Sequence, residues 1–208
     1  MTDHRPGLRE RTRRAVRQDI TEAAQRLFVE HGYEQTTMDD VAEAAGLSRR
    51  SLFRYFPTKE DLIVGKFELL AETMVELLRE RPLAEPAWTS LRRIFDLLVP
   101  YVDAPGKHEV AEPMQRIVFS TPALLASYLE KLHRMAAGVE TVLRERAETR
   151  GAPYEPGDPA PPAIAGAAFS CLLAAQHAWL AGGAGEDGAT FAGCLDRAMA
   201  ALAPAGTA

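Results

Sequence analysis

Two adjacent arginines, Arg49 and Arg50, directly follow a short turn of sequence A-G-L-S. Arginine can donate two parallel hydrogen bonds to guanine, the commonest specific contact between a protein and a DNA base. A helix that begins after this turn would present an almost wholly polar first face, which fits the major groove. A solvated helix face without function is the alternative. The residues expected to read DNA from this face are Ser48, Arg49, Arg50, Ser51 and Arg54.

A second group of residues flanks this face and is suited to hold the DNA backbone. Thr36 and Thr37 stand at an expected helix start, where hydroxyls and free backbone N–H groups bind anions. Tyr55 and Lys59 follow the expected reading helix and could grip phosphates on the other strand. For Tyr55, a place in the core is the alternative. We expect these four residues to position the reading helix rather than to select bases.

These side chains need two short helices held at a fixed angle. Thr37 and Asp40 have the spacing of a capping box, which predicts a helix start at Thr37. Gly46 suits a tight turn between helices because it lacks a Cβ. Leu52 and Phe53 are expected to anchor the inner side of the second helix. The pattern predicts a helix-turn-helix.

Charge is distributed unevenly along the 208 residues. The net charge is −5, which would disfavour nucleic acid if it were evenly spread. Residues 1–66 carry 12 Lys and Arg against 11 Asp and Glu, whereas residues 67–208 carry 12 against 18. A basic front and an acidic remainder indicate a protein that approaches DNA with one end.

Apolar periodicity predicts an all-α fold of about nine helices. We expect a flexible basic arm over residues 1–11, whose arginines either enter the minor groove or add non-specific attraction. A helix-turn-helix domain over 12–58 and a helical ligand-binding and dimerisation domain over 59–208 should follow. The expected helices are 12–31, two short helices after Thr37 and Ser48, 59–80, 87–102, 109–119, 121–150, 164–180 and 190–202, followed by a frayed tail to 208.

The stretch Gly32–Leu62, G-Y-E-Q-T-T-M-D-D-V-A-E-A-A-G-L-S-R-R-S-L-F-R-Y-F-P-T-K-E-D-L, resembles the DNA-binding signature of the TetR (tetracycline-repressor-like) family of bacterial regulators. The resemblance covers about residues 12–66 and is dense. It implies a homodimer, a three-helix DNA-binding domain and a six-helix domain that binds a small molecule and releases repression. Arg50 stands where the family often has a small residue, and Phe53 where it usually has tyrosine. The phosphate contact of that tyrosine is therefore not transferred to Phe53.

The second domain should then hold a dimer seam and a ligand pocket. Two Ala-rich final helices could form a four-helix bundle with a second copy, although they could also pack internally. The candidate seam residues are Gly166, Ser170, Ala174, Ala178, Phe191, Leu195 and Met199. An apolar or amphipathic ligand is expected among the middle helices. The candidate pocket residues, each of which could instead be core, are Trp88, Phe95, Leu98, Met114, Ile117, Phe119, Tyr128, Phe169, Leu173, Gln176 and His177.

Catalytic signatures are lacking in the sequence. It has no P-loop, no Rossmann fingerprint and no nucleophile elbow, and its histidines are scattered. We therefore expect no enzyme, no cofactor and no metal. The two cysteines have neither metal-binding nor redox spacing, which suggests a reducing compartment. The sequence also has no secretory signal and no run of about 18 apolar residues, so we expect a cytoplasmic protein. An architectural DNA binder without a ligand and an all-α enzyme carrying this motif are the alternatives.

Overall fold

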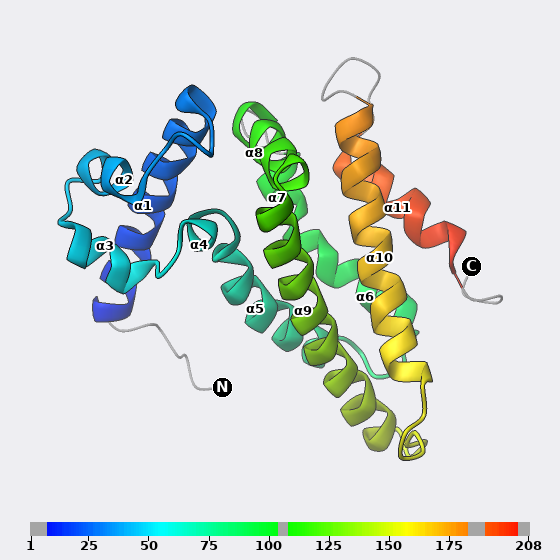
Figure 1. Cartoon of the computed structure of the whole chain (residues 1–208). Coiled ribbons are helices and arrows are strands. Elements are labelled where there is room, and N and C mark those ends of the chain that lie inside the picture. Colours follow the sequence, from blue (N-terminus) through cyan, green and yellow to red (C-terminus); the bar gives the residue numbers. More distant parts are fainter. Residues whose placement is uncertain (1–7, 104–107, 183–189, 204–208) are drawn as a thin grey trace. The chain divides into compact units, whose positions relative to one another are not determined.

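The computed structural model describes residues 8–103, 108–182 and 190–203, with backbone alone for 8–11, 14, 66–69 and 108–110. These residues form helices and turns, and none of those described is in a strand. The chain divides into two compact units, with unit 1 ending at Lys66 and unit 2 beginning at Phe67 (Figure 1). Residues 1–7 of the expected arm and 204–208 of the expected tail lie outside the described residues.

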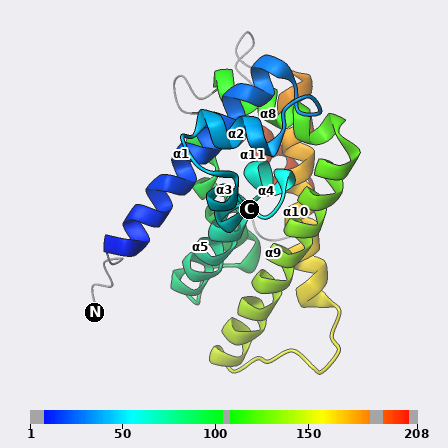
Figure 2. The same cartoon turned by 60° about the vertical axis from the view of Figure 1, so that its left-hand side comes forward.

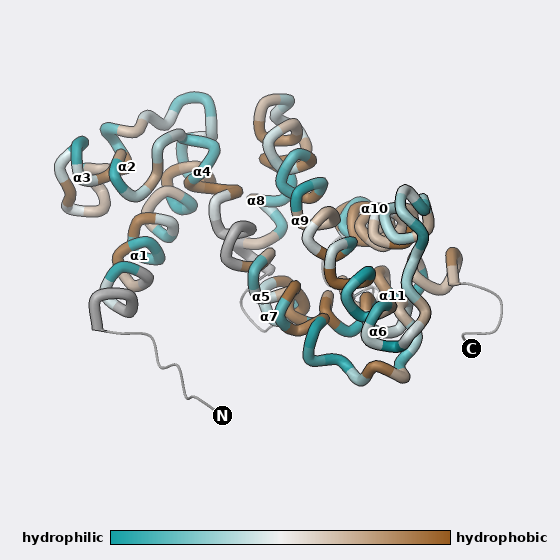
Figure 3. Tube along the Cα trace, turned by 90° about the horizontal axis from the view of Figure 1, so that it is seen from below, coloured by the Kyte–Doolittle hydropathy of each residue, from teal (hydrophilic) through white to brown (hydrophobic). Residues whose placement is uncertain are grey.

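Unit 1 is a small helical domain built around the first helix. Its core consists of apolar residues at helical spacing on that helix, together with residues from the three that follow. Both hydrophobic and hydrophilic residues occur within single turns of α1, as an amphipathic helix requires (Figure 3). The helices are α1 (Leu8–His31), α2 (Met38–Ala44), α3 (Arg49–Tyr55) and α4 (Lys59–Val64).

Two boundaries in this region differ from those expected. Helix α1 begins at Leu8 rather than Thr12, so the end of the expected arm is helical. The helix expected over 59–80 is two helices, because the chain breaks at Gly65 after α4. A Cβ at Gly65 would lie 2.3 Å from the carbonyl oxygen of Asp61, so only glycine fits this joint. The apolar residues of α4 are buried, which extends unit 1 beyond the expected boundary at 58.

Unit 2 is an all-helical bundle. The long helices α9 and α10 lie side by side, and α11 packs against α10 (Figures 1 and 2). The core includes Trp88, whose indole N–H donates to the carbonyl of Met199 at 3.0 Å. The helices are α5 (Lys66–Glu80), α6 (Ala87–Ile94), the 3-10 helix η1 (Phe95–Leu97), α7 (Val99–Val102), α8 (His108–Ser120), α9 (Pro122–Thr149), α10 (Ala160–Ala181) and α11 (Phe191–Ala201).

Prolines account for two further differences in unit 2. The helix expected over 87–102 changes to a 3-10 turn before Pro100, which has no N–H to continue the α-helical ladder. Helix α10 starts at Ala160 rather than Ile164, because two prolines fit a first turn where no N–H is needed. The carboxylate of Asp158 accepts from the N–H of Ala160 at 2.8 Å and holds this start.

Helix α10 corrects one expectation from composition. Its length and hydropathy would allow it to cross a membrane, which corrects the expectation that the chain has no run of about 18 apolar residues. Half of its most apolar 18-residue segment is buried within the fold. A core helix of a folded domain has the same composition, and α10 packs on both α9 and α11.

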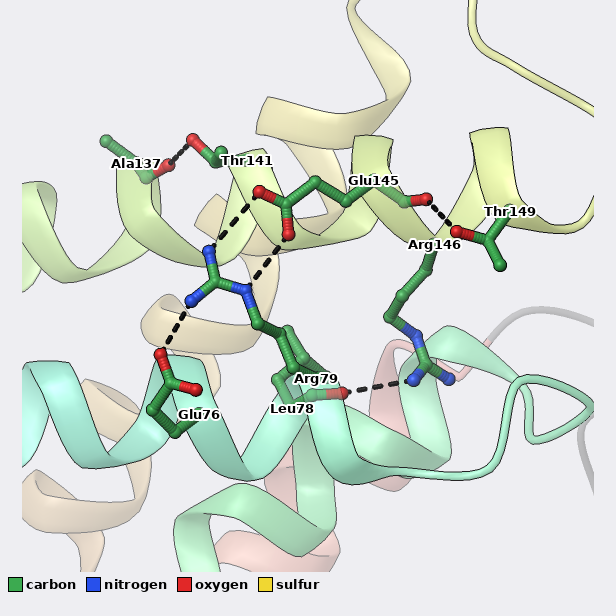
Figure 4. A network of polar contacts seen from close by, with 8 residues as sticks. All are labelled: Glu76, Leu78, Arg79, Ala137, Thr141, Glu145, Arg146 and Thr149. Atoms are coloured by element: carbon green, nitrogen blue, oxygen red, sulfur yellow. Dashed lines mark hydrogen bonds and ion pairs between the residues drawn. The ribbon is translucent and has the colours of Figure 1, made fainter. Parts of the chain in front are cut away.

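Arg146 of α9 fixes the end of α5. Its guanidinium is buried and donates to the carbonyl oxygens of Leu78 at 3.0 Å, Arg81 at 2.6 Å and Pro82 at 2.8 Å. Nearby, exposed Arg79 reaches across to Glu145 of α9 (Figure 4). A buried arginine at a helix C-terminus satisfies carbonyls that have no partner within the helix.

Candidate nucleic-acid interface

The turn between α2 and α3 has the geometry that the helix-turn-helix pattern predicts. Gly46 adopts a φ of 65°, a left-handed conformation that glycine tolerates best. The N–H of Leu47 donates to the carbonyl of Ala42 at 2.8 Å, which closes the turn. Ser48 caps α3, with its hydroxyl oxygen 3.2 Å from the N–H of Ser51. Buried Val41, Ala42 and Leu52 hold the two helices together.

Three arginines are exposed on α3: Arg49, Arg50 and Arg54. Arg49 makes an ion pair with Asp39 of α2, with 3.1 Å between Nη1 and Oδ2. Its guanidinium carbon also lies 5.5 Å from the centre of the Phe53 ring. Phe53 is 37% exposed, so the expectation that it anchors the inner side of α3 is wrong. Helix α3 therefore presents cations and one aromatic ring to solvent.

The two threonines before α2 differ in accessibility. Thr36 is only 2% exposed, and its hydroxyl donates to the carbonyls of Gly32 at 2.9 Å and Leu27 at 3.3 Å. This placement contradicts the phosphate contact expected for Thr36, which instead joins the end of α1 to α2. Thr37 is exposed, but its N–H and hydroxyl both donate to the carboxylate of Asp40, at 2.7 and 2.8 Å. A phosphate at Thr37 would have to compete with that carboxylate.

The capping box also affects the acidity of Asp40. Hydrogen bonds from the backbone N–H and then the hydroxyl of Thr37 lower the pKa of Asp40 below its ordinary value. Asp40 is therefore ionised near neutral pH, and α2 begins with two carboxylates, Asp39 and Asp40. The helix dipole stabilises these two negative charges at the N-terminus of α2, and the charges in turn repel a bound phosphate.

Tyr55, the last residue of α3, and Lys59, the first residue of α4, are half-buried. The carbonyl of Tyr55 accepts a hydrogen bond from Arg17 of α1 at 2.9 Å, which fixes the end of α3. The ammonium of Lys59 lies 4.1 Å from the centre of the Tyr33 ring and 3.4 Å from the carbonyl of Glu34. Burial, followed by a hydrogen bond to Glu60, raises the pKa of Tyr33. Contacts with α1 and with the loop that follows α1 thus hold both residues in place.

Two aromatic clusters in unit 2 contain candidate pocket residues. Phe95 and Phe169 pack edge to face, with ring centres 5.4 Å apart. In the second cluster, the Tyr128 hydroxyl donates to the amide oxygen of Gln176 at 2.8 Å, and burial raises the pKa of Tyr128. Phe119 contacts both the Tyr128 ring and the exposed imidazole of His177. The other candidates are distributed between buried (Trp88, Leu98, Met114) and half-buried (Ile117, Leu173) positions.

The candidate seam residues separate into two groups. Ser170, Ala174 and Ala178 are exposed along one face of α10, with half-buried Gly166 beside them. By contrast, Phe191, Leu195 and Met199 of α11 are at most 3% exposed within their own subunit. These three residues are core residues, and their expected place in a dimer seam is corrected. The bulky residues of α11 face α10 because an apolar stripe buries itself against the nearest helix.

Two contacts that hold α3 could not be read from the motif itself. Asp39 pairs with Arg49 across the turn, and Arg17 secures α3 from α1. The first was detectable in principle, because the two helices of this motif begin close together. The second depends on a contact between residues 38 positions apart, which no local spacing reveals.

Comparison with known proteins agrees with this geometry. Residues 20–64 match the family described as bacterial regulatory proteins, tetR family, and residues 85–206 match the MftR C-terminal domain. The chain is 31% identical over 150 residues to the HTH-type transcriptional regulator TcmR of Streptomyces glaucescens, covering 70% of this chain and 66% of TcmR. It is 42% identical over 69 residues to the repressor AcnR of Corynebacterium glutamicum, covering 33% and 37%. The chain thus aligns with only part of the length of each of these relatives.

A solved structure extends the likeness in fold to most of the chain. FadR of Thermus thermophilus, a repressor solved in complex with lauroyl-CoA, aligns with 88% of this chain and 91% of its own. The TM-score is 0.56 and the identity 21%, so this likeness concerns the fold. The two family matches cover most of unit 1, including α2 and α3, and most of unit 2. The chain therefore belongs to the TetR family of bacterial regulatory proteins.

Proposed function

We propose that this protein is a cytoplasmic transcriptional repressor that binds a specific DNA sequence. The observation that carries the proposal is the exposed first turn of α3, where Arg49 and Arg50 project from a turn fixed by buried anchors. A rigid, polar helix start of this kind fits the major groove, and arginine there reads guanine. Ser48, Ser51 and Arg54 complete the reading face, and Tyr55 and Lys59 contact the flanking phosphates.

The proposed binding form is a homodimer on a palindromic operator. One short helix reads too few bases to be specific in a genome, and a two-fold dimer doubles the contacts. The small exposed residues of α10, Gly166, Ser170, Ala174 and Ala178, support a close approach of two such helices. The large apolar residues of α11 are buried within their own subunit, so in this proposal they support α10 from inside and do not contact the second copy.

A small apolar or amphipathic molecule is the proposed effector, which binds unit 2 and releases the DNA. The Tyr128–Gln176 hydrogen bond supports this, because it places a buried polar pair within an aromatic cluster that reaches the exposed His177. Few polar groups among many apolar ones are typical of ligand sites. The complex of FadR with lauroyl-CoA makes that compound a reasonable first probe.

Footprinting tests the proposal on a duplex that the protein itself enriches from a randomised pool. We expect protection of two inverted half-sites whose centres are about 34–36 Å, or a multiple of that distance, apart. The reason is that a two-fold dimer places its two reading helices on the same side of the duplex. Uniform coverage without sequence preference would instead indicate an architectural DNA binder.

The same footprint, repeated with saturating lauroyl-CoA and other amphipathic compounds, tests the effector. Release requires a ligand that binds one conformation better, with a coupling of roughly 1–3 kcal/mol. We expect at least one compound of this class to weaken operator binding. Operator affinity unchanged across the set would contradict this effector class and leave the DNA-binding result standing.

A further inference from the structure

The ion pair between Asp39 and Arg49 joins the starts of the two helices that form the reading motif. The side chains remain 60% and 66% exposed, respectively. An exposed ion pair of this kind contributes little to stability. The unit is already held by buried Val41, Ala42 and Leu52. A role for the pair must therefore be sought in what Arg49 contacts rather than in folding.

Arg49 is restrained on a second side as well. Its guanidinium carbon lies 5.5 Å from the centre of the Phe53 ring, one helical turn further along α3. The guanidinium is thus placed between a carboxylate from α2 and an aromatic ring from α3. A long side chain held in this way loses less conformational entropy when it binds a base.

The geometry leaves Arg49 able to bind while it stays paired. A guanidinium has five N–H donors, and the hydrogen bond to Asp39 engages Nη1. Donors on the other nitrogens remain for the paired acceptors of guanine. Asp40, the neighbouring acid, does not share this role because its carboxylate is engaged by Thr37.

Asp39 also places a negative charge on a surface that approaches the DNA backbone. Phosphates repel this carboxylate, so a loose, sequence-independent approach is penalised. When Arg49 binds the correct base, its charge and hydrogen bonds offset that repulsion. An acid beside a reading arginine therefore weakens binding to wrong sequences more than binding to the right one.

We propose that Asp39 is a positioning residue that sets the sequence specificity of this protein through Arg49. It orients the guanidinium and disfavours binding to DNA of other sequence. The inference rests on the proposed function, since it requires that α3 reads DNA.

The test is selection from a randomised duplex pool with the full-length protein, carried out for wild type, Asp39→Asn, Arg49→Ala and the double variant. Glu43→Gln is the matched control, because it removes the same charge from an exposed position on the same helix. We expect Asp39→Asn to relax base preference at the positions that Arg49→Ala also relaxes, and the double variant to add nothing further there. Glu43→Gln should keep the wild-type profile.

Binding to a poly(dI-dC) duplex gives an independent readout. Asp39→Asn should bind it several-fold more tightly than Glu43→Gln does, with a salt slope steeper by up to about 0.9, the value of one added phosphate contact. The inference is overturned if Asp39→Asn matches Glu43→Gln in both profile and slope. A wild-type protein that enriches no sequence would instead refute the proposed function, which keeps the two failures distinct.

Discussion

Arg49 and Arg50 are adjacent and both exposed, yet different contacts surround them. Arg49 is held between Asp39 and Phe53, whereas Arg50 projects from the first turn of α3 as an exposed side chain. Preorganisation by neighbours favours precise base contacts, while a mobile cation can satisfy either a base or a phosphate. The two residues are therefore expected to differ in the kind of binding energy that they contribute.

Arg50→Ala is expected to weaken operator binding by roughly 1–3 kcal/mol if the arginine reads a base. The loss should be larger on the selected operator than on poly(dI-dC), because base contacts exist only on the correct sequence. Titration of both duplexes by fluorescence anisotropy measures the difference. Arg26→Ala, which removes an exposed arginine from α1, serves as the control. An equal loss on both duplexes would make Arg50 a phosphate contact.

At this scale the sequence predicts the caps and turns well, because each depends on a few neighbouring residues. The capping box of Thr37 with Asp40 and the tight turn at Gly46 are confirmed in the structure. The burial of Thr36 and the exposure of Phe53 could not be predicted in this way. Thr36 lies in the loop before α2, where helical periodicity gives no signal, and α3 has only seven residues, too few for periodicity to show which side is buried.

Single elements in unit 2 depend on contacts between distant segments. Helix α5 ends at a buried guanidinium that belongs to α9, and this joins residues more than 60 positions apart. No local pattern in the sequence points to a role for Arg146, because an arginine near the end of a long helix is normally a surface residue. Prolines, by contrast, explain the broken helix before Pro100 and the early start of α10 through local geometry alone.

Arg146→Met is expected to destabilise unit 2 by about 2–4 kcal/mol, because it leaves buried carbonyl groups without donors. Arg79→Met is the matched control. Arg79 lies in the same region, but its ion pairs with Glu76 and Glu145 are exposed to solvent (Figure 4), so their loss should lower the free energy of unfolding much less. Urea unfolding followed by tryptophan fluorescence is suitable, since both tryptophans, Trp88 and Trp179, lie in unit 2. Equal effects of the two substitutions would mean that Arg146 is not a structural cap.

At the scale of the whole molecule, the order of the helices and the all-α class could be predicted, because amphipathic periodicity over long segments is a strong signal. For the dimer seam, the sequence could indicate only that the last two helices are candidates. Composition cannot tell whether an apolar helix faces its own subunit or a second copy, and the burial of Phe191, Leu195 and Met199 assigns α11 largely to its own core. The exposed small residues of α10 remain as the proposed seam.

Ala174→Glu tests that seam. A charge placed where two helices approach closely must be desolvated, so the dimer should dissociate while the subunit stays folded. Sedimentation velocity should show a shift towards monomer, and operator affinity should fall with it. Ala137→Glu adds the same charge to an exposed position on α9 and should leave the dimer intact. An unchanged dimer in Ala174→Glu would place the seam elsewhere.

Gly65 places a limit on how this chain can diverge over evolutionary time. Its missing side chain is what permits the chain to pass from α4 to α5, because any Cβ would collide with the carbonyl of Asp61. Every single-nucleotide change that replaces this glycine therefore introduces a steric defect at once. A descendant of this gene that replaces Gly65 must therefore also shift the backbone between α4 and α5.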